Sequence, residues 1–139
     1  MPWDKPFYTE IVRPNGVVFG AESHIVVFPA SDGERAVLYQ HAPFLCQLGM
    51  GLLRILDTGK KWHCFWIKRG IAEVTEKKQM WILPEEIKPA SEINIEETKR
   101  LVEEILQRPV ASSSRSQREE ELHCAKSLLH AAQKASPYM

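Results

Sequence analysis

The chain has 139 residues, with 18 basic and 18 acidic side chains and a formal net charge of zero. This length suits one domain with a sizeable core and a small appendage. The balanced charge gives no field that would draw the protein to nucleic acid or to a membrane surface, and without a spanning apolar run or a signal sequence we expect a cytosolic protein.

The first part of the chain, from residue 7 to about residue 83, consists of short strand-like runs separated by turn residues. The runs are FYTEIVR, GVVFGA, SHIVVF, AVL, LLRIL, KWHCFWIK, IAEVT and MWIL. Runs of β-branched and aromatic residues, interrupted at short intervals by Gly, Asn, Asp and Pro, indicate an antiparallel β-sandwich or barrel. The dipeptide RG after KWHCFWIK is interpreted as a turn, and LPEEIKPASE as a connection.

The strand KWHCFWIK is apolar on both of its alternating faces. One face carries Trp62, Cys64 and Trp66, and the other carries His63, Phe65 and Ile67. Such a strand is expected to be covered on both sides. One cover is a second sheet, and the other is either the C-terminal appendage or a separate partner protein.

Nothing in the sequence predicts catalysis, a cofactor or a metal site. The three cysteines, Cys46, Cys64 and Cys124, are odd in number and widely spaced, which indicates free thiols. His63 and Cys64 are adjacent, but neighbouring side chains of a strand point to opposite faces and do not easily share a metal ion. No nucleophile elbow, dinucleotide fingerprint or phosphate-binding loop is present.

Helix-forming residues take over after Pro89. Asn94, with Glu97 three residues later, predicts a helix cap, and Pro109 ends that helix. The stretch PVASSSRS is a flexible turn, and Ser116 with Glu119 repeats the cap before a second helix.

Both helices carry an apolar stripe, so we predict an antiparallel two-helix hairpin. The fold class is therefore α+β, with a β-sandwich over residues 1–86, a linker over 87–93 and the hairpin over 94–139. The stripe of the second helix is rich in small residues that bury little area, so we expect the hairpin to detach easily. These small residues are Ala125, Ala131, Ala132 and Ala135.

Four motifs then follow one another in order ahead of the helices: EIVRPNGVVF, ASDGERAVLYQHAPFL, GMGLLRI and RGIAEV. This order, from Phe7 to Ala135, resembles the epsilon subunit of the F-type ATP synthase. The resemblance implies a non-catalytic subunit of the central rotor that binds the gamma subunit and the membrane c-ring and couples proton flow to ATP synthesis. It also implies a peripheral location at the cytoplasmic face of the inner or plasma membrane, reached only through the complex.

The resemblance assigns candidate docking residues. The loops that carry Asp32, Glu34, Gln40 and His41 would face the c-ring, and an apolar flank with Trp62 or Trp66 would face gamma. Two positions depart from the family, because Ala36 and Gln40 replace glycines. Those positions now carry side chains, which puts the geometry of the loop in question.

The resemblance also implies that the hairpin extends toward the alpha and beta subunits of the catalytic head and inhibits ATP hydrolysis. The candidate contacts are Arg115, Arg118, Lys126 and Lys134, and the alternative is that they form a solvated face. Some bacterial members bind ATP through an Ile-Asp-x-x-Arg-Ala motif, where this chain has Asn94 and Glu97 in place of the aspartate and the arginine. We therefore predict weak or absent ATP binding.

A different class of function remains as an alternative. A stand-alone β-sandwich would bind a ligand or metal through His41 and His63, with the hairpin as a lid.

Overall fold

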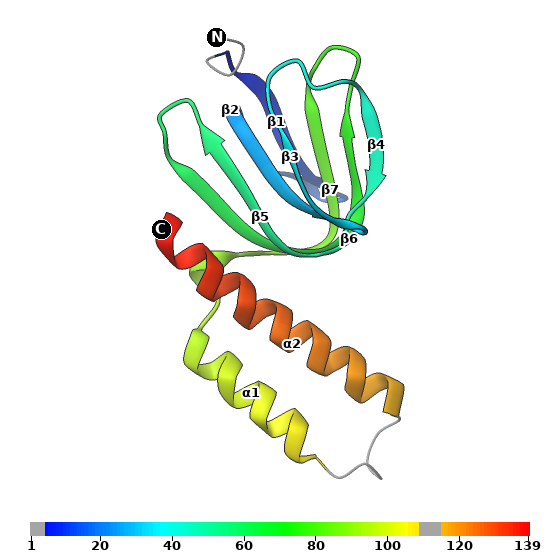
Figure 1. The fold of residues 1–139 in the computed structure, drawn as a ribbon, viewed down its shortest axis with the longest axis vertical. Coiled ribbons are helices and arrows are strands. Elements are labelled where there is room, and N and C mark those ends of the chain that lie inside the picture. The colour runs from blue at the N-terminus through cyan, green and yellow to red at the C-terminus, as the bar shows by residue number, and fades with distance from the viewer. Residues whose placement is uncertain (1–4, 109–114) are drawn as a thin grey trace.

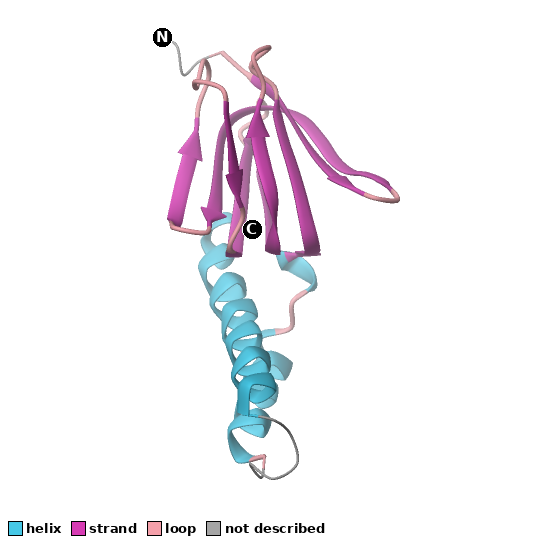
Figure 2. Ribbon diagram, turned by 90° about the vertical axis from the view of Figure 1, so that its right-hand side faces the viewer, coloured by secondary structure: helices cyan, strands magenta, loops and turns pink. Residues whose placement is uncertain are grey.

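The computed structural model describes residues 5–108 and 115–139, and it places a β-sandwich at one end of the molecule and a helical hairpin at the other (Figures 1 and 2). The strands are β1 (Phe7–Arg13), β2 (Gly16–Ala30), β3 (Gly33–Val37), β4 (Phe44–Gln47), β5 (Met50–Asp57), β6 (Trp62–Val74) and β7 (Met80–Pro89). The helices are α1 (Ile95–Gln107) and α2 (Arg115–Ala135), with short 3-10 helices η2 (Ala90–Glu92) and η4 (Ser136–Tyr138).

The strands pair in the order β1-β7-β6-β5-β2-β3, with β4 added to β6 and with β1 also paired to β2. All pairs are antiparallel except β1 with β7, which is parallel. The long strand β2 pairs with β1 through its first half and with β3 and β5 through its second half. It therefore passes between the two layers, and the predicted runs GVVFGA and SHIVVF are one strand. The predicted α+β fold with an N-terminal sandwich is confirmed.

The RG dipeptide does not form the predicted turn. Arg69 and Gly70 lie within β6 with positive φ angles of 56° and 115°. A Cβ on Gly70 would approach the Leu83 carbonyl oxygen and would lie 2.8 Å from the Pro84 Cα atom, so a side chain does not fit. The dipeptide kinks β6 instead of ending it. The predicted connection LPEEIKP is likewise strand, because β7 continues to Pro89, beyond the expected boundary at residue 86.

Two apolar clusters hold the molecule together. The inner cluster fills the sandwich, and five of its large side chains, Phe28, Leu53, Ile55, Ile67 and Ile82, have no exposed surface. The second cluster joins the outer face of β5 and β6 to η2 and α2, with Leu52, Cys64, Trp66, Ala90, Ile93, Ala131, Ala132 and Ala135 buried in it. The two predicted faces of KWHCFWIK are thus real, and the appendage supplies the second cover.

The first helix begins where the sequence predicts. The Oδ1 atom of Asn94 accepts a hydrogen bond from the backbone N–H of Glu97 at 2.9 Å. The second helix begins at Arg115, so Ser116 lies inside α2 and does not precede it as expected. The predicted helix end at Pro109 and most of the PVASSSRS turn lie outside the described residues. The two helices run side by side in opposite directions, as Figure 1 shows.

Candidate docking surfaces

The strand β3 separates the predicted ring-facing residues into two groups. Glu34 lies at its start, where its Oε2 atom accepts a hydrogen bond from Lys134 Nζ at 2.8 Å and its Oε1 atom accepts one from Arg54 Nη2 at 3.0 Å. Asp32, in the preceding turn, pairs with Arg35 at 2.8 Å. This end of β3 thus contacts the end of α2.

Gln40 and His41 follow the other end of β3. Lys78, in the turn between β6 and β7, donates a hydrogen bond to the His41 carbonyl oxygen at 3.3 Å. The His41 ring donates from Nδ1 to the Ala42 carbonyl oxygen at 2.8 Å and meets the Phe44 ring edge-on. At roughly 3.3 Å per residue, five residues separate the two groups by about 17 Å.

Gln40 adopts the backbone conformation that the family's glycine would allow. Its φ angle is 64°, in the left-handed region that residues with side chains rarely occupy. Ala36, the other replaced glycine, lies within β3 and is exposed. The substitution at residue 40 therefore keeps the glycine-like backbone angle at a cost in strain of about 1 kcal/mol.

The two tryptophans predicted to face gamma lie beneath the hairpin. Trp66 is 4% exposed, and its indole Nε1–H donates to the Ser127 hydroxyl of α2 at 3.0 Å. Trp62 meets the ring of Tyr138 edge-on, with centroids 5.1 Å apart. Trp66 is thus covered by the hairpin, whereas Trp62 is half-buried beside Tyr138. A contact of Trp66 with gamma would require the hairpin to leave.

The four predicted cations of the hairpin differ in what they do. Lys134 binds Glu34, as described above. Arg118 donates to the carbonyl oxygens of Ile105 at 3.2 Å and Leu106 at 2.7 Å, and so caps the C-terminal end of α1. Arg115 forms an exposed ion pair with Glu119 within α2, and Lys126 is exposed. Lys134 therefore holds the hairpin to the sandwich and Arg118 holds its two helices together, whereas Arg115 and Lys126 face solvent.

One apolar surface was missed in the sequence. Leu45 on β4, Ile71 on β6 and Leu83 on β7 are 66%, 42% and 37% exposed. Ile71 lies directly opposite Leu83 in the β6–β7 pair, and Leu45 lies opposite Glu73, two residues along β6. These residues therefore share the outer face of the sheet, which we call the β4–β6–β7 face. The alternation of side chains between the two faces of the sheet in IAEV and MWIL could have indicated that Ile71 and Leu83 point outward.

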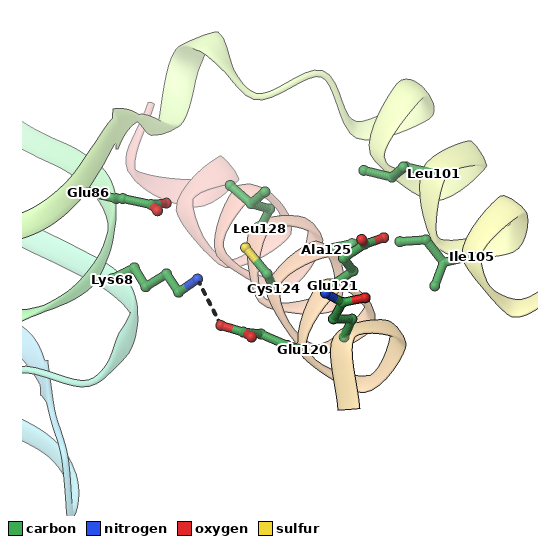
Figure 3. Close-up of a pocket in the computed structure, with 10 residues that line it drawn as sticks. Lys68, Glu86, Leu101, Ile105, Glu120, Glu121, Cys124, Ala125 and Leu128 are labelled. Atoms are coloured by element: carbon green, nitrogen blue, oxygen red, sulfur yellow. Dashed lines mark ion pairs between the residues drawn. The ribbon is translucent and has the colours of Figure 1, made fainter. Parts of the chain in front are cut away.

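A groove lies between the hairpin and the sandwich (Figure 3). Its charged lining includes Lys68, Glu86, Glu120 and Glu121, and Lys68 pairs with Glu120 at 3.8 Å. Acidic side chains thus outnumber basic ones around it, which disfavours a phosphate-bearing ligand. Weak or absent ATP binding remains a prediction.

The cysteines and histidines do not form a metal site among the residues that the structure describes. All three cysteines are free, as predicted, and burial raises the pKa of the Cys64 thiol. His63 pairs with Asp57 at 2.8 Å, and this hydrogen bond, followed by one from the Lys61 backbone, holds the pKa of the Asp57 carboxyl below its ordinary value. His41 and His63 each have their own partners, so no specific observation favours the alternative ligand-binding function.

In the part of the chain that the structure describes, no helix is both long and apolar enough to cross a bilayer.

Comparison with known proteins identifies the sandwich. Residues 6–90 match the family model of the ATP synthase delta/epsilon chain, beta-sandwich domain. The ATP synthase epsilon chain of Desulforamulus reducens is 32% identical over 123 residues, which cover 88% of this chain and 89% of the relative.

Two solved structures are similar in fold. One is a chain of the Euglena gracilis mitochondrial ATP synthase, solved with OSCP, F1 and the c-ring, with a TM-score of 0.79 and 21% identity over 94% of this chain and 81% of that chain. The other belongs to the central stalk and c-ring of the Tetrahymena thermophila mitochondrial ATP synthase, with a TM-score of 0.62 and 12% identity over 94% of this chain and 96% of that chain.

Proposed function

The chain belongs to the delta/epsilon chain family of ATP synthase, and from this premise we propose which of its surfaces serve the complex. Its role is that of a non-catalytic subunit of the central stalk, whose partners are the gamma subunit, the c-ring and the catalytic head. Its association with the membrane is peripheral and depends on the complex. We place it at the cytoplasmic face of the inner or plasma membrane, where it helps to couple proton flow to ATP synthesis.

The observation that carries the proposal is the uncovered β4–β6–β7 face. Large apolar side chains exposed together on one sheet mark an interaction surface more often than an ordinary solvated surface. The hairpin covers the other outer face of the sheet, on β5 and β6, so the β4–β6–β7 face is the flank that stays open to gamma while the hairpin is docked. Gamma would then bind a rigid sheet, as the transmission of rotation requires.

The c-ring contact is assigned to the edge formed by β3. This strand lies at the end of the pairing order, and its residues from Gly33 to Ala36 are exposed. The edge joins Asp32 and Glu34 at one end to Gln40 and His41 at the other. A ring of repeated subunits presents a wide surface. Such a surface can contact the residues at both ends of β3 at once.

The hairpin is assigned a regulatory role toward the catalytic head. Lys126 is exposed on α2 and can meet an acidic partner, and Arg115 can do so by exchanging its exposed ion pair with Glu119. Deletion of residues 91–139 tests this role, because it removes the helices and leaves β7 whole. We expect the assembled enzyme to hydrolyse ATP faster after the deletion, and an unchanged rate would remove the inhibitory role.

The gamma contact is tested by replacing the exposed apolar side chains with glutamine in a triple variant, Leu45→Gln, Ile71→Gln and Leu83→Gln. Native mass spectrometry with the gamma subunit from the same source would show a one-to-one complex for the wild-type chain. We expect the triple variant to bind at least about tenfold more weakly, since buried apolar side chains dominate such interfaces.

The matched control is Leu106→Gln. Leu106 is 50% exposed on α1, outside the β4–β6–β7 face, and this variant should bind gamma like the wild type. Equal binding by the wild type and the triple variant would rule out this face as the gamma contact.

A further inference from the structure

The last turn of the chain is fastened to the sandwich by a polar network. Arg54, a nearly buried residue of β5, donates from Nη1 to the Tyr138 hydroxyl at 2.6 Å and from Nη2 to Glu34 at 3.0 Å. Lys134 closes the network on the second oxygen of Glu34 at 2.8 Å. Two residues of the sandwich thus hold two residues at the end of the hairpin.

The aromatic ring of Tyr138 adds packing to this network. The Arg54 guanidinium carbon lies 5.1 Å from the centre of the ring, and Trp62 meets the same ring from the sandwich. A cation over an aromatic face and an edge-on ring pair each add attraction beyond the burial of apolar area. Tyr138 is therefore held by a hydrogen bond, a cation and a second ring.

We propose that Glu34 and Arg54 of the sandwich and Lys134 and Tyr138 of the C-terminal segment form a latch that sets how often the hairpin leaves the sheet. Elsewhere in the interface the fully buried side chains of α2 are alanines, which contribute little area each, with Cys124 and Leu128 partly buried beside them and Ser127 bound to the Trp66 indole. A hydrogen bond to a charged group that is as little exposed as Arg54 contributes more than one alanine contact supplies. The latch therefore supplies a large share of the interaction energy that is lost when the hairpin leaves the sheet.

The latch also connects the hairpin to the β3 edge. Glu34 lies on the edge assigned to the c-ring, and both of its carboxylate oxygens are engaged by the latch. A cationic group of the ring that binds Glu34 competes with Lys134 for the same carboxylate. Docking on the ring then loosens the hairpin, a consequence that rests on the proposed function, whereas the latch itself does not.

Alkylation of Cys64 measures opening directly. This thiol is 9% exposed beneath α2, so it reacts with iodoacetamide when the hairpin leaves. Cys46, on β4, packs against the inner cluster and serves as an internal reference for the sandwich. Peptide mass spectrometry of the full chain gives both rates in one experiment, and their ratio reports opening of the hairpin alone.

We expect Lys134→Gln to raise the ratio of the Cys64 rate to the Cys46 rate about threefold, and Tyr138→Phe about tenfold. Lys134→Arg keeps the charge and should remain near the wild-type ratio. Lys126→Gln removes an exposed charge elsewhere on α2 and should leave the ratio unchanged. Wild-type ratios for both Lys134→Gln and Tyr138→Phe would overturn the latch.

The assembled complex separates the latch from the ring contact. Lys134→Gln opens the latch but retains Glu34, so its assembly with the c-ring should be normal. Glu34→Gln opens the latch and should also weaken that assembly. If Glu34→Gln raises the Cys64 ratio in the isolated chain and assembles normally, the latch stands and the proposed ring contact of Glu34 is wrong.

Discussion

The two apolar clusters of this protein are built from different side chains, and the difference divides the molecule into a rigid part and a removable part. The sandwich is filled by Phe, Leu, Ile and Met side chains with no exposed surface. The hairpin segment contributes Ala131, Ala132 and Ala135 as its buried side chains in the contact with the sheet, and its larger side chains there, Cys124, Leu128 and Tyr138, are only partly buried. Burial stabilises roughly in proportion to apolar area, so the sandwich gains far more per residue than the hairpin contact does.

Polar contacts compensate for the small side chains at the hairpin. The Trp66 indole, Arg54 and Glu34 each bind a residue of the C-terminal segment. When the hairpin leaves, water or a partner protein can replace each of these hydrogen bonds, so the net free energy lost per contact is modest. Loss of the hairpin should therefore leave the sandwich folded, whereas loss of one large core side chain should affect the whole chain.

The largest expected effect is that of Phe28→Ala. Phe28 is buried without exposed surface in the inner cluster, and its ring stacks near Phe44 with centroids 6.2 Å apart. Truncation leaves a cavity and should lower the free energy of unfolding by about 3–5 kcal/mol. Urea denaturation followed by circular dichroism measures it. A loss below about 1 kcal/mol would contradict the contrast between the two clusters.

Gly70→Ala should have the next largest effect and lower the free energy of unfolding by about 2–4 kcal/mol. The φ of 115° strains any side chain, and the new Cβ meets the Leu83 carbonyl oxygen and the Pro84 Cα atom of β7. Gly33→Ala is the matched control, because Gly33 has a φ of 133° with nothing within 4 Å of an added Cβ. Urea denaturation should show a loss of only about 1 kcal/mol for the control.

Gly70 also marks where sequence reasoning reaches its limit. A turn and a kink within a strand both need residues that tolerate positive φ, so RG alone does not tell them apart. The pairing of Gly70 with Pro84, on the opposite strand, decides the matter, and that pairing joins segments of the chain that no local pattern connects. The prolines in LPEEIKP likewise favoured a connection, because the local sequence does not show that this segment pairs with β6.

The local sequence pattern, in contrast, was sufficient to predict features that depend on one element alone. The alternation of KWHCFWIK gave both faces of β6, and Asn94 with Glu97 gave the start of α1. The latch was beyond reach, because Lys134 and Glu34 are 100 residues apart and each was assigned to a different partner. Charged side chains on two surfaces predict a contact only when the fold brings those surfaces together.

The hairpin contact should be sensitive to added volume. Ala132 is 2% exposed in the second cluster, and Ala132→Leu adds a branched side chain at this buried position. Overpacking costs about 1–3 kcal/mol, which corresponds to a Cys64 alkylation rate about 5- to 150-fold higher. Gln133→Leu, at an exposed neighbouring position, should alkylate like the wild type. A wild-type Cys64 rate in Ala132→Leu would show that the contact has room for the larger side chain and is not closely packed.

The smallest expected effect is a pH dependence of the hairpin contact. The hydrogen bond from Lys134, opposed by burial and assisted by the charges of Lys134 and Arg54, holds the pKa of the Glu34 carboxyl below its ordinary value of 4.5. A carboxyl whose pKa is lower in the docked state stabilises docking above pH 4.5, and this contribution is lost as the pH falls through the lowered value.

Exchange of the Trp66 indole N–H, followed by NMR, reports this loss because that group donates to Ser127 of α2. Compared with Glu34→Gln at each pH, the wild-type chain should exchange more slowly at pH 6, and the difference should vanish at the acidic end. The shift of Asp57 affects the sandwich in both chains alike and cancels in the comparison. Protonated Glu and Gln are both neutral and nearly equal in shape, so a difference that persists below the lowered pKa would mean that the charge of Glu34 is not what holds the hairpin on the sheet.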